Sequence, residues 1–151
     1  MKNFETLQEL AALVGQAVST SDWVVVTQEH INQFAQATGD HQWIHVDVER
    51  AKSGPFGAPI AHGFLTLSLI PTFFASAVHI AQVRMGVNYG LNRVRFMGPV
   101  PVNSRLRASI KLLKAEPIEN EGMQFTWEVT TEREGVAKPV CIAESISRLY
   151  P

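Results

Sequence analysis

The hydrophobic pattern of the chain changes its period near the middle. Before the middle, apolar residues recur every three or four positions over Phe4 to Val14 and again in the segment that follows Thr27. This spacing is typical of helices that bury one face. We predict one helix in each segment, ending at Gly15 and Gly39, because glycine is the common residue just beyond a helix C-terminus. Thr27 is the predicted N-cap of the second helix.

A third helix is predicted from Ala61 to Val78. Its apolar residues cover nearly the whole circumference, so we expect it to be buried on most sides. Pro71 removes one intrahelical hydrogen bond, and a kink or break is expected there. The turn-rich segment Gly54 to Pro59 precedes this helix and separates it from the second one.

After this helix, apolar and polar residues alternate, which is the pattern of half-buried strands. The alternating segments are Val83 to Tyr89, Arg105 to Leu112 and Met123 to Val129, with Val140 to Leu149 as a less regular fourth. Helices followed by strands indicate an α+β domain with an antiparallel sheet, here curved around the apolar helix. We predict a single domain over residues 1–151, with residues 1–20 as an N-terminal helical extension.

Composition and charge narrow the class of protein. The 151 residues are 46% hydrophobic and carry a formal net charge of −1, which indicates a folded domain without general attraction to nucleic acid or to an anionic membrane. The longest apolar region is interrupted by polar residues, so we interpret it as a buried helix and not as a membrane span. Cys141 is the single cysteine, which excludes an internal disulfide and fits a reducing compartment. The first residues do not resemble a secretory signal, and we expect a cytoplasmic location.

The segment GDHQWIHVD contains the first candidate for chemistry. Asp40 follows the end of the second helix, and His45 lies five residues further in the predicted loop. A carboxylate and an imidazole that share one water molecule can act as an acid–base pair. From spacing alone, an aspartate that only forms a turn and a histidine with a structural role remain the alternative.

The segment Ala61-His62-Gly63 is the second candidate. Backbone N–H groups at the start of a helix can bind an oxyanion, and a glycine lets a ligand approach closely, although an ordinary helix start explains the segment equally well. Ser68 lies inside the predicted helix, where a hydroxyl often bonds to its own backbone. The five histidines are scattered and are accompanied by one cysteine, so we expect no metal site.

These segments together resemble a known family. FAQATGDHQWIHVDVERAKSGPFGAPIAHGFLTLSLIP closely resembles the core of the MaoC-like dehydratases, which are related to the (R)-specific enoyl-CoA hydratases. NYGLNRVRFMGPVPVNSRLR resembles the corresponding segment of their nodulation-protein-N-like branch. The resemblance implies a hot-dog fold, in which a curved antiparallel sheet wraps a long central helix. It also implies a homodimer or higher homo-oligomer, with substrate tunnels near the subunit interface.

The resemblance further implies an activity. The family adds water reversibly to a trans-2-enoyl thioester of coenzyme A or acyl carrier protein, giving the (R)-3-hydroxyacyl thioester, without a metal or redox cofactor. By this resemblance Asp40 and His45 hold and activate the water, while the Gly63 N–H binds the thioester carbonyl. Ser68 and Gln42 are expected to support the site.

The resemblance is not complete. Many members have Asn-Pro between the catalytic Asp and His, whereas this chain has Gln42 and Trp43. His62 and Asp47 also match the family pattern, and we interpret both as structural. Two other functions remain open: a hot-dog thioesterase, in which water attacks the carbonyl carbon, and an acyl-thioester binding protein without catalytic activity.

Overall fold

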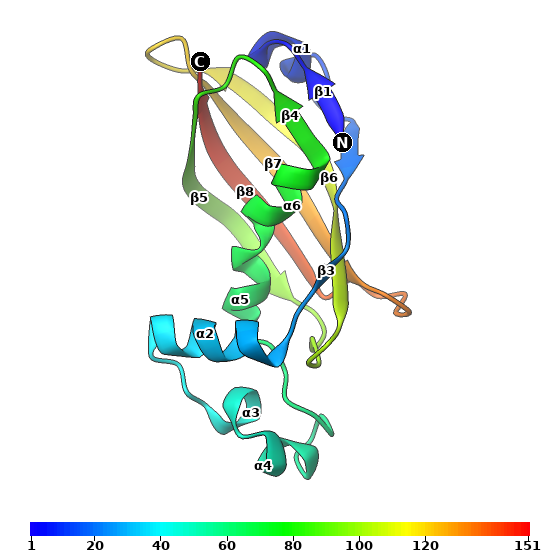
Figure 1. The fold of residues 1–151 in the computed structure, drawn as a ribbon. Helices are drawn as coiled ribbons and strands as arrows, with labels where there is room; N and C mark the ends of the chain where they lie inside the picture. The colour runs from blue at the N-terminus through cyan, green and yellow to red at the C-terminus, as the bar shows by residue number, and fades with distance from the viewer.

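The computed structural model describes residues 1–151 and contains a strongly curved six-stranded sheet, drawn in Figure 1. Its strands pair antiparallel in the order β2-β6-β7-β8-β5, and the short β3 also pairs with β6. β1 and β4 form a separate parallel pair. The strands are β1 (Lys2–Phe4), β2 (Ala17–Thr20), β3 (Val24–Val25), β4 (Val78–Ile80), β5 (Met85–Phe96), β6 (Arg105–Pro117), β7 (Met123–Arg133) and β8 (Cys141–Tyr150).

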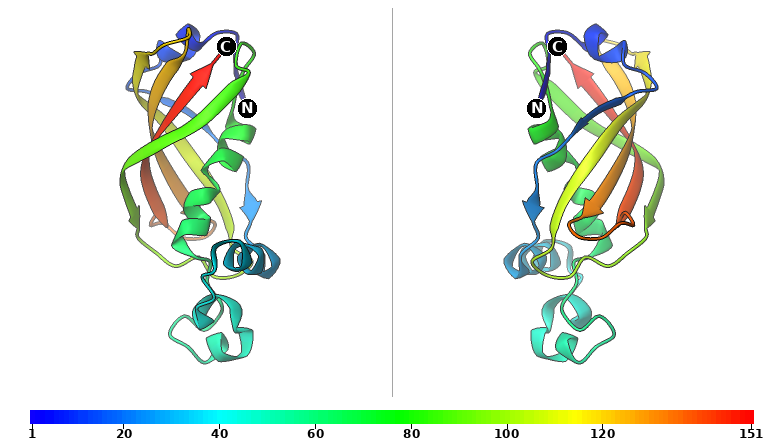
Figure 2. Two further views of the ribbon diagram at one scale, coloured as in Figure 1. Left: turned by 90° about the vertical axis from the view of Figure 1, so that its left-hand side faces the viewer. Right: turned by 90° about the vertical axis from the view of Figure 1, so that its right-hand side faces the viewer.

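The helices gather inside the curve of the sheet and at one end of it, as Figure 2 shows from two sides. α5 and α6 run in succession along the concave face, while α2, α3 and α4 lie beyond the lower end of the sheet in Figure 1. No helix is both long and apolar enough to cross a membrane. The helices are α1 (Leu7–Ala11), α2 (Gln28–Thr38), α3 (Trp43–Val46), α4 (Val48–Lys52), α5 (Gly63–Ser68) and α6 (Ile70–Ala77).

The core forms where the alternating residues of the sheet meet the central helix. The apolar residues predicted to face inward on β6 and β7 are all buried, and Phe73 of α6 packs among them with no exposed surface. Trp127 of β7 contacts Phe74 of α6 edge to face, with ring centroids 4.9 Å apart. The alternation in the second half of the sequence therefore predicted the inner face of these two strands correctly.

The break in the central helix is confirmed. α5 ends at Ser68 and α6 begins at Ile70, so that Pro71 lies in the first turn of α6. A proline is tolerated there because the first N–H groups of a helix have no intrahelical acceptor. The predicted helix is too long at both ends, because α5 begins at Gly63 and not at Ala61, and Val78 is already the first residue of β4.

The N-terminal segment differs from the predicted helical extension. Within residues 1–20 only α1 is helical, with β1 before it and β2 after it. β2 pairs with β6 at the edge of the main sheet, and β1 pairs with β4. Each of these strands is four residues or shorter, too short to show a clear period of two, so tertiary pairing decided their structure.

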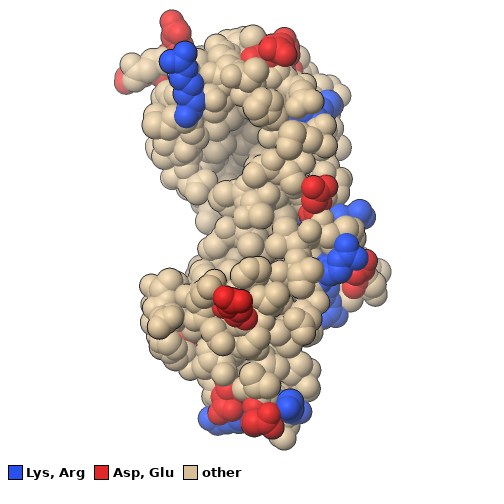
Figure 3. Space-filling view, in the orientation of Figure 1, with Lys and Arg blue, Asp and Glu red and all other residues tan.

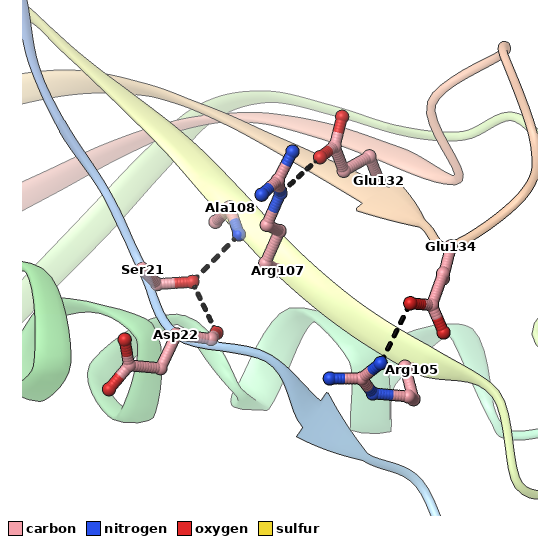
Figure 4. A network of polar contacts seen from close by, with 7 residues as sticks. All are labelled: Ser21, Asp22, Arg105, Arg107, Ala108, Glu132 and Glu134. Carbon is pink, nitrogen blue, oxygen red and sulfur yellow. Dashed lines mark hydrogen bonds and ion pairs between the residues drawn. The ribbon is translucent and has the colours of Figure 1, made fainter.

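The arginines of β6 are held by acidic residues on the neighbouring strand and the turn that follows it. Arg107 pairs with Glu132, and Arg105 Nη1 lies 2.7 Å from Glu134 Oε1 (Figure 4). Both guanidinium groups also lie near the ring of Trp23. These two arginines are therefore paired with acidic side chains on the surface of the sheet.

Candidate active site

Three titratable side chains converge at the end of the sheet where α2, α3 and the start of α5 meet. Asp40 follows the C-cap of α2, His45 lies in α3, and His62 is the N-cap of α5. One ligand atom of each side chain lies within 4.8 Å of the other two. Asp40 is exposed and both histidines are buried, so the cluster has one face open to solvent.

Local caps place Asp40 at this point. Thr27 caps α2 by accepting a hydrogen bond from the His30 N–H, and Gly39 ends the helix in the left-handed conformation with φ of 80°. Any residue with a Cβ is strained at this φ angle, so glycine makes the turn without cost. Both predicted caps are confirmed, and they direct the chain from α2 towards α3.

One contact of the His45 ring determines its neutral tautomer, and a second contact fixes its backbone. Its Nδ1 lies 2.6 Å from the backbone carbonyl oxygen of Ile60. Because a carbonyl can only accept, Nδ1 carries the proton and donates, which leaves Nε2 of the neutral ring unprotonated. The Gln28 side-chain amide donates to the His45 backbone carbonyl at 2.8 Å and ties α3 to α2. His45 thus has the geometry of a general base that acts through Nε2.

The surroundings of His45 favour this neutral form. Burial lowers the pKa of His45 below its ordinary value of 6.5, and the imidazole of His62 lowers it further. The hydrogen bond to the Ile60 carbonyl and the charge of Asp40 act in the opposite direction without reversing the shift.

A pH profile of turnover tests this assignment. A base must be unprotonated to work, so activity is lost as the pH falls through the pKa of His45. Because that pKa is lowered, we expect the acidic limb of the kcat/KM profile to have its midpoint below 6.5. An acidic limb centred above 6.5 in steady-state assays would contradict the assignment.

Gln42 and Trp43 stand where many family members have Asn-Pro, yet the backbone here has the conformation that an Asn-Pro pair would adopt. Gln42 has φ of −55° and ψ of 136°, a conformation that a following proline would impose. Trp43 is the first residue of α3, the helix position that proline favours. Its ring packs on the Arg50 guanidinium at 4.2 Å and against Gly54. Gln42 approaches Asp40 through its backbone, with its N–H 3.3 Å from Asp40 Oδ1, and its side chain is exposed.

Gly63 begins α5 beside an aromatic ring. A Cβ at this position would lie 2.9 Å from the Phe96 ring, so only glycine fits without a shift of that side chain. As the first helical residue, Gly63 has no intrahelical acceptor for its N–H. Its backbone can therefore bind the carbonyl oxygen of a ligand, as the sequence predicts.

No activated nucleophile is found among the serine and cysteine candidates. Ser68 donates its hydroxyl to the Phe64 backbone carbonyl at 2.7 Å, which is the bond to its own helix considered above as the alternative. Burial raises the pKa of the Cys141 thiol to about 11, so the reactive thiolate is scarce. Asp47 caps α4 by accepting from the Arg50 N–H, which confirms its structural role. Water is therefore the attacking group that the cluster can supply.

His62 contributes more to the cluster than the sequence indicated. Its ring stacks on that of His45 with centroids 3.8 Å apart and an interplanar angle of 24°. A metal ion binds a histidine in the plane of the ring at about 2.0–2.1 Å. Two stacked rings with centroids 3.8 Å apart cannot both direct an in-plane nitrogen at the same ion. The three side chains therefore suit proton transfer better than metal coordination. The AHG segment drew attention to His62 in the sequence, but it could not show that the ring stacks on His45, which lies 17 residues earlier.

The main cavities lie along the central helix and not at Asp40. A cavity of about 500 Å³ lies between α6 and the sheet, with Phe74, Val87 and Trp127 in its wall. A neighbouring cavity of about 340 Å³ shares Pro71 with it and reaches Ser68. Together they form a groove whose first wall residue on the helix is Leu67, about one turn beyond Gly63, or about 6 Å along the axis.

The sheet curves around α5 and α6, and the Asp–His cluster lies at the start of α5. This arrangement defines a hot-dog domain with an acid–base site. The chain belongs to the MaoC-like family, because residues 9–133 match the family described as "MaoC like domain". It is 54% identical over 148 residues to 3-hydroxyacyl-thioester dehydratase Z of Mycobacterium tuberculosis, which covers 98% of each chain. It is 43% identical over 144 residues to nodulation protein N of Rhizobium leguminosarum bv. viciae, covering 94% of this chain and 89% of that one.

Solved structures confirm the predicted hot-dog fold. The monoamine oxidase regulatory protein from Archaeoglobus superposes with a TM-score of 0.77 at 24% identity, covering 98% of this chain and 95% of the other. An (R)-hydratase from A. caviae superposes with a TM-score of 0.68 at 18% identity, covering 90% and 97%. At these identities the structures establish the shared architecture, while the relatives above establish the family.

Proposed function

We propose that this protein is a hydro-lyase that adds water to trans-2-enoyl thioesters and, in reverse, dehydrates (R)-3-hydroxyacyl thioesters. The observation that carries the proposal is the cluster of Asp40 and the buried His45, with the His45 Nε2 unprotonated, beside the free N–H of Gly63. The name of the mycobacterial relative, a 3-hydroxyacyl-thioester dehydratase, supports the same reaction.

Each group has a role in the proposed reaction. The Gly63 N–H donates to the thioester carbonyl, and this bond strengthens as negative charge develops on the oxygen in the transition state. His45 Nε2 and the Asp40 carboxylate hold one water; its oxygen bonds to C3 while the C2–C3 double bond becomes single. The proton removed from the water is returned by the pair to C2, so the atoms balance. The roles of base and acid are assigned to the pair and not to either side chain alone.

The proposed reaction needs no redox cofactor, because no electrons are transferred to or from the substrate, and it assigns no step to a metal, because the acid–base pair and the Gly63 N–H supply its catalytic groups. The stacked geometry of His45 and His62 supports the same conclusion. Coenzyme A or acyl carrier protein takes part as the thiol portion of the substrate. The buried single cysteine agrees with a cytoplasmic location, which we propose as well.

A hydration assay tests the function directly. Wild-type protein is mixed with crotonyl-CoA and with longer trans-2-enoyl-CoA esters, and both the enoyl absorbance and free thiol are followed. We expect the absorbance to fall without release of thiol. Thiol release would identify a thioesterase instead, and tight binding without either signal would identify a binding protein.

We propose that the groove along α5 and α6 receives the acyl chain. The wall of its larger cavity is mainly apolar, which suits an aliphatic chain. Ser68 lines the smaller cavity, and we propose that it supports the site from there.

Filling the groove is expected to change chain-length preference. Ala75 is exposed on α6 and lines the larger cavity, so that Ala75→Phe places a ring in the groove. Each methylene that loses its buried position forfeits about 0.8 kcal/mol, and a loss of two to three of them lowers kcat/KM for a long enoyl chain by roughly 10- to 60-fold. Crotonyl-CoA turnover should stay near wild type. An equal loss on both substrates would contradict the placement of the acyl chain.

We further propose that the protein is a homodimer formed through β5. Only one edge of β5 is paired within the chain, and large apolar side chains are exposed on it and on α5. Figure 3 shows that the hollowed face over these elements is almost free of charged side chains. An unpaired apolar edge strand is a surface that natural proteins normally cover. The exposed residues are Phe64, Met85, Val87, Tyr89, Leu91 and Phe96.

A further inference from the structure

His62 joins the elements that build the active site. Its ring stacks on His45 of α3 and contacts Phe34 of α2, with centroids 4.9 Å apart. Its Nε2 lies 2.9 Å from the backbone carbonyl oxygen of Asp40, in the segment between α2 and α3. Its own backbone is the N-cap of α5 and precedes Gly63. One side chain therefore touches or adjoins all three groups of the proposed reaction.

The hydrogen bonds of His62 determine its tautomer. The Asp40 carbonyl can only accept, so Nε2 of His62 carries the proton and donates. Nδ1 is then a bare acceptor, and it is buried without any hydrogen-bond partner.

The unpartnered Nδ1 also argues against a role in packing alone. A buried acceptor without a partner is unfavourable and uncommon in folded proteins. A phenylalanine would fill the space between His45 and Phe34 without this cost. What a phenylalanine cannot do is donate to the Asp40 carbonyl, so the donor at Nε2 is the feature that distinguishes histidine here.

We propose that His62 is a positioning residue. It holds Asp40 by donating to the Asp40 backbone carbonyl and holds His45 by stacking on the His45 ring, so that both side chains can bind the same water molecule. The proposal rests on the hydration reaction proposed above. Its first part concerns the Nε2–H donor and the placement of Asp40. Its second part concerns the stacked ring and the orientation of His45.

Two substitutions separate these parts. His62→Gln carries an amide nitrogen at nearly the position of Nε2, so it can still donate to the Asp40 carbonyl. His62→Phe keeps the ring and loses the donor. We expect His62→Phe to lower kcat by about 10- to 100-fold, the scale on which a small misplacement of reacting groups acts, with little change in KM. His62→Gln should recover most of that loss, and His30→Gln, an exposed histidine on α2, is the matched control.

An NMR titration of the imidazoles gives a readout that does not depend on turnover. His62 and Asp40 are the titratable groups that act on His45, and the imidazole of His62 disfavours the His45 cation. We therefore expect the midpoint of the His45 titration to rise in both variants, with the Nδ1–H tautomer kept in His62→Gln. The signal is assigned from its absence in His45→Gln.

The outcomes are distinct. Wild-type kcat and an unmoved His45 titration in His62→Phe would show that His62 only fills space. If His62→Phe unfolds, His62→Asn replaces it, because its shorter amide does not reach the Asp40 carbonyl; equal turnover in the Asn and Gln variants would then overturn the proposal. A wild-type protein that hydrates no enoyl thioester defeats the proposed function, while the titration still decides whether His62 acts on His45.

Discussion

Replacing His45 with glutamine is expected to lower kcat by at least about a hundredfold, because general acid–base catalysis by a placed side chain contributes about 10²- to 10⁴-fold. Glutamine can keep one hydrogen bond but cannot accept the proton from water. Asp40→Asn should cause a loss of the same order, since the neutral amide neither takes up a proton nor balances a charged His45. Both are measured as the initial rate of loss of enoyl absorbance.

The two variants should keep the fold for different reasons. Asp40 is exposed and its carboxylate accepts only the Gln42 N–H, so its amide costs little stability. His45 is buried and bonded to the Ile60 carbonyl, and a small fall in melting temperature is expected when that bond weakens. His30→Gln and Asp22→Asn serve as exposed controls. Turnover close to wild type in either site variant, with the fold intact, would remove the mechanism.

A double variant that combines Asp40→Asn with His45→Gln tests whether the two residues act as a pair. If Asp40 and His45 act on one water, removing the second group after the first has little further effect on kcat, as is found for residues that work as a unit. Losses that multiply would mean that the two side chains act on separate steps. This comparison uses the same assay and needs no further assumption about which group is the base.

The parts of this structure that depend on neighbouring residues could be predicted from the sequence. Thr27 and Gly39 act within one turn of α2, so their roles follow from residue type and position. The inward faces of β6 and β7 follow from an alternation sustained over seven or more residues. The closeness of Asp40 and His45 could also be predicted, because only five residues of chain separate them and the family pattern places both at the site.

The parts decided by distant contacts could not be predicted. β5 alternates like a half-buried strand, yet nearly all of it is exposed in the single chain. The central helix is similarly open along one side, where Phe64 is 67% exposed. His62 was interpreted as structural because nothing in AHG indicates that its ring meets His45 and that its Nε2 meets the Asp40 carbonyl. In each case the missing information is the identity of a partner far away in sequence or in a second copy of the chain.

Disruption of the proposed β5 interface is expected to separate the protein into monomers and to remove most of its activity. Leu91→Lys places a charge within the apolar patch, which a second copy could cover only by burying an unpaired ammonium group. Val14→Lys, which changes an exposed valine outside the patch, is the matched control. Light scattering after gel filtration should give half the wild-type mass for Leu91→Lys and an unchanged mass for Val14→Lys.

The loss of activity follows from the open side of the site. In the single chain Asp40 is exposed and the groove along α5 and α6 is uncovered, so bulk water reaches the groups that must hold one water molecule. A two-fold partner that pairs along β5 would cover this face on both copies at once and raise the strength of each polar contact inside it. Leu91 also lines the groove, so Met85→Lys, which lies outside it, must give the same result. A monomer with wild-type kcat in either variant, or a dimer that survives both charges, would show that the site is complete within one chain or that the copies meet elsewhere.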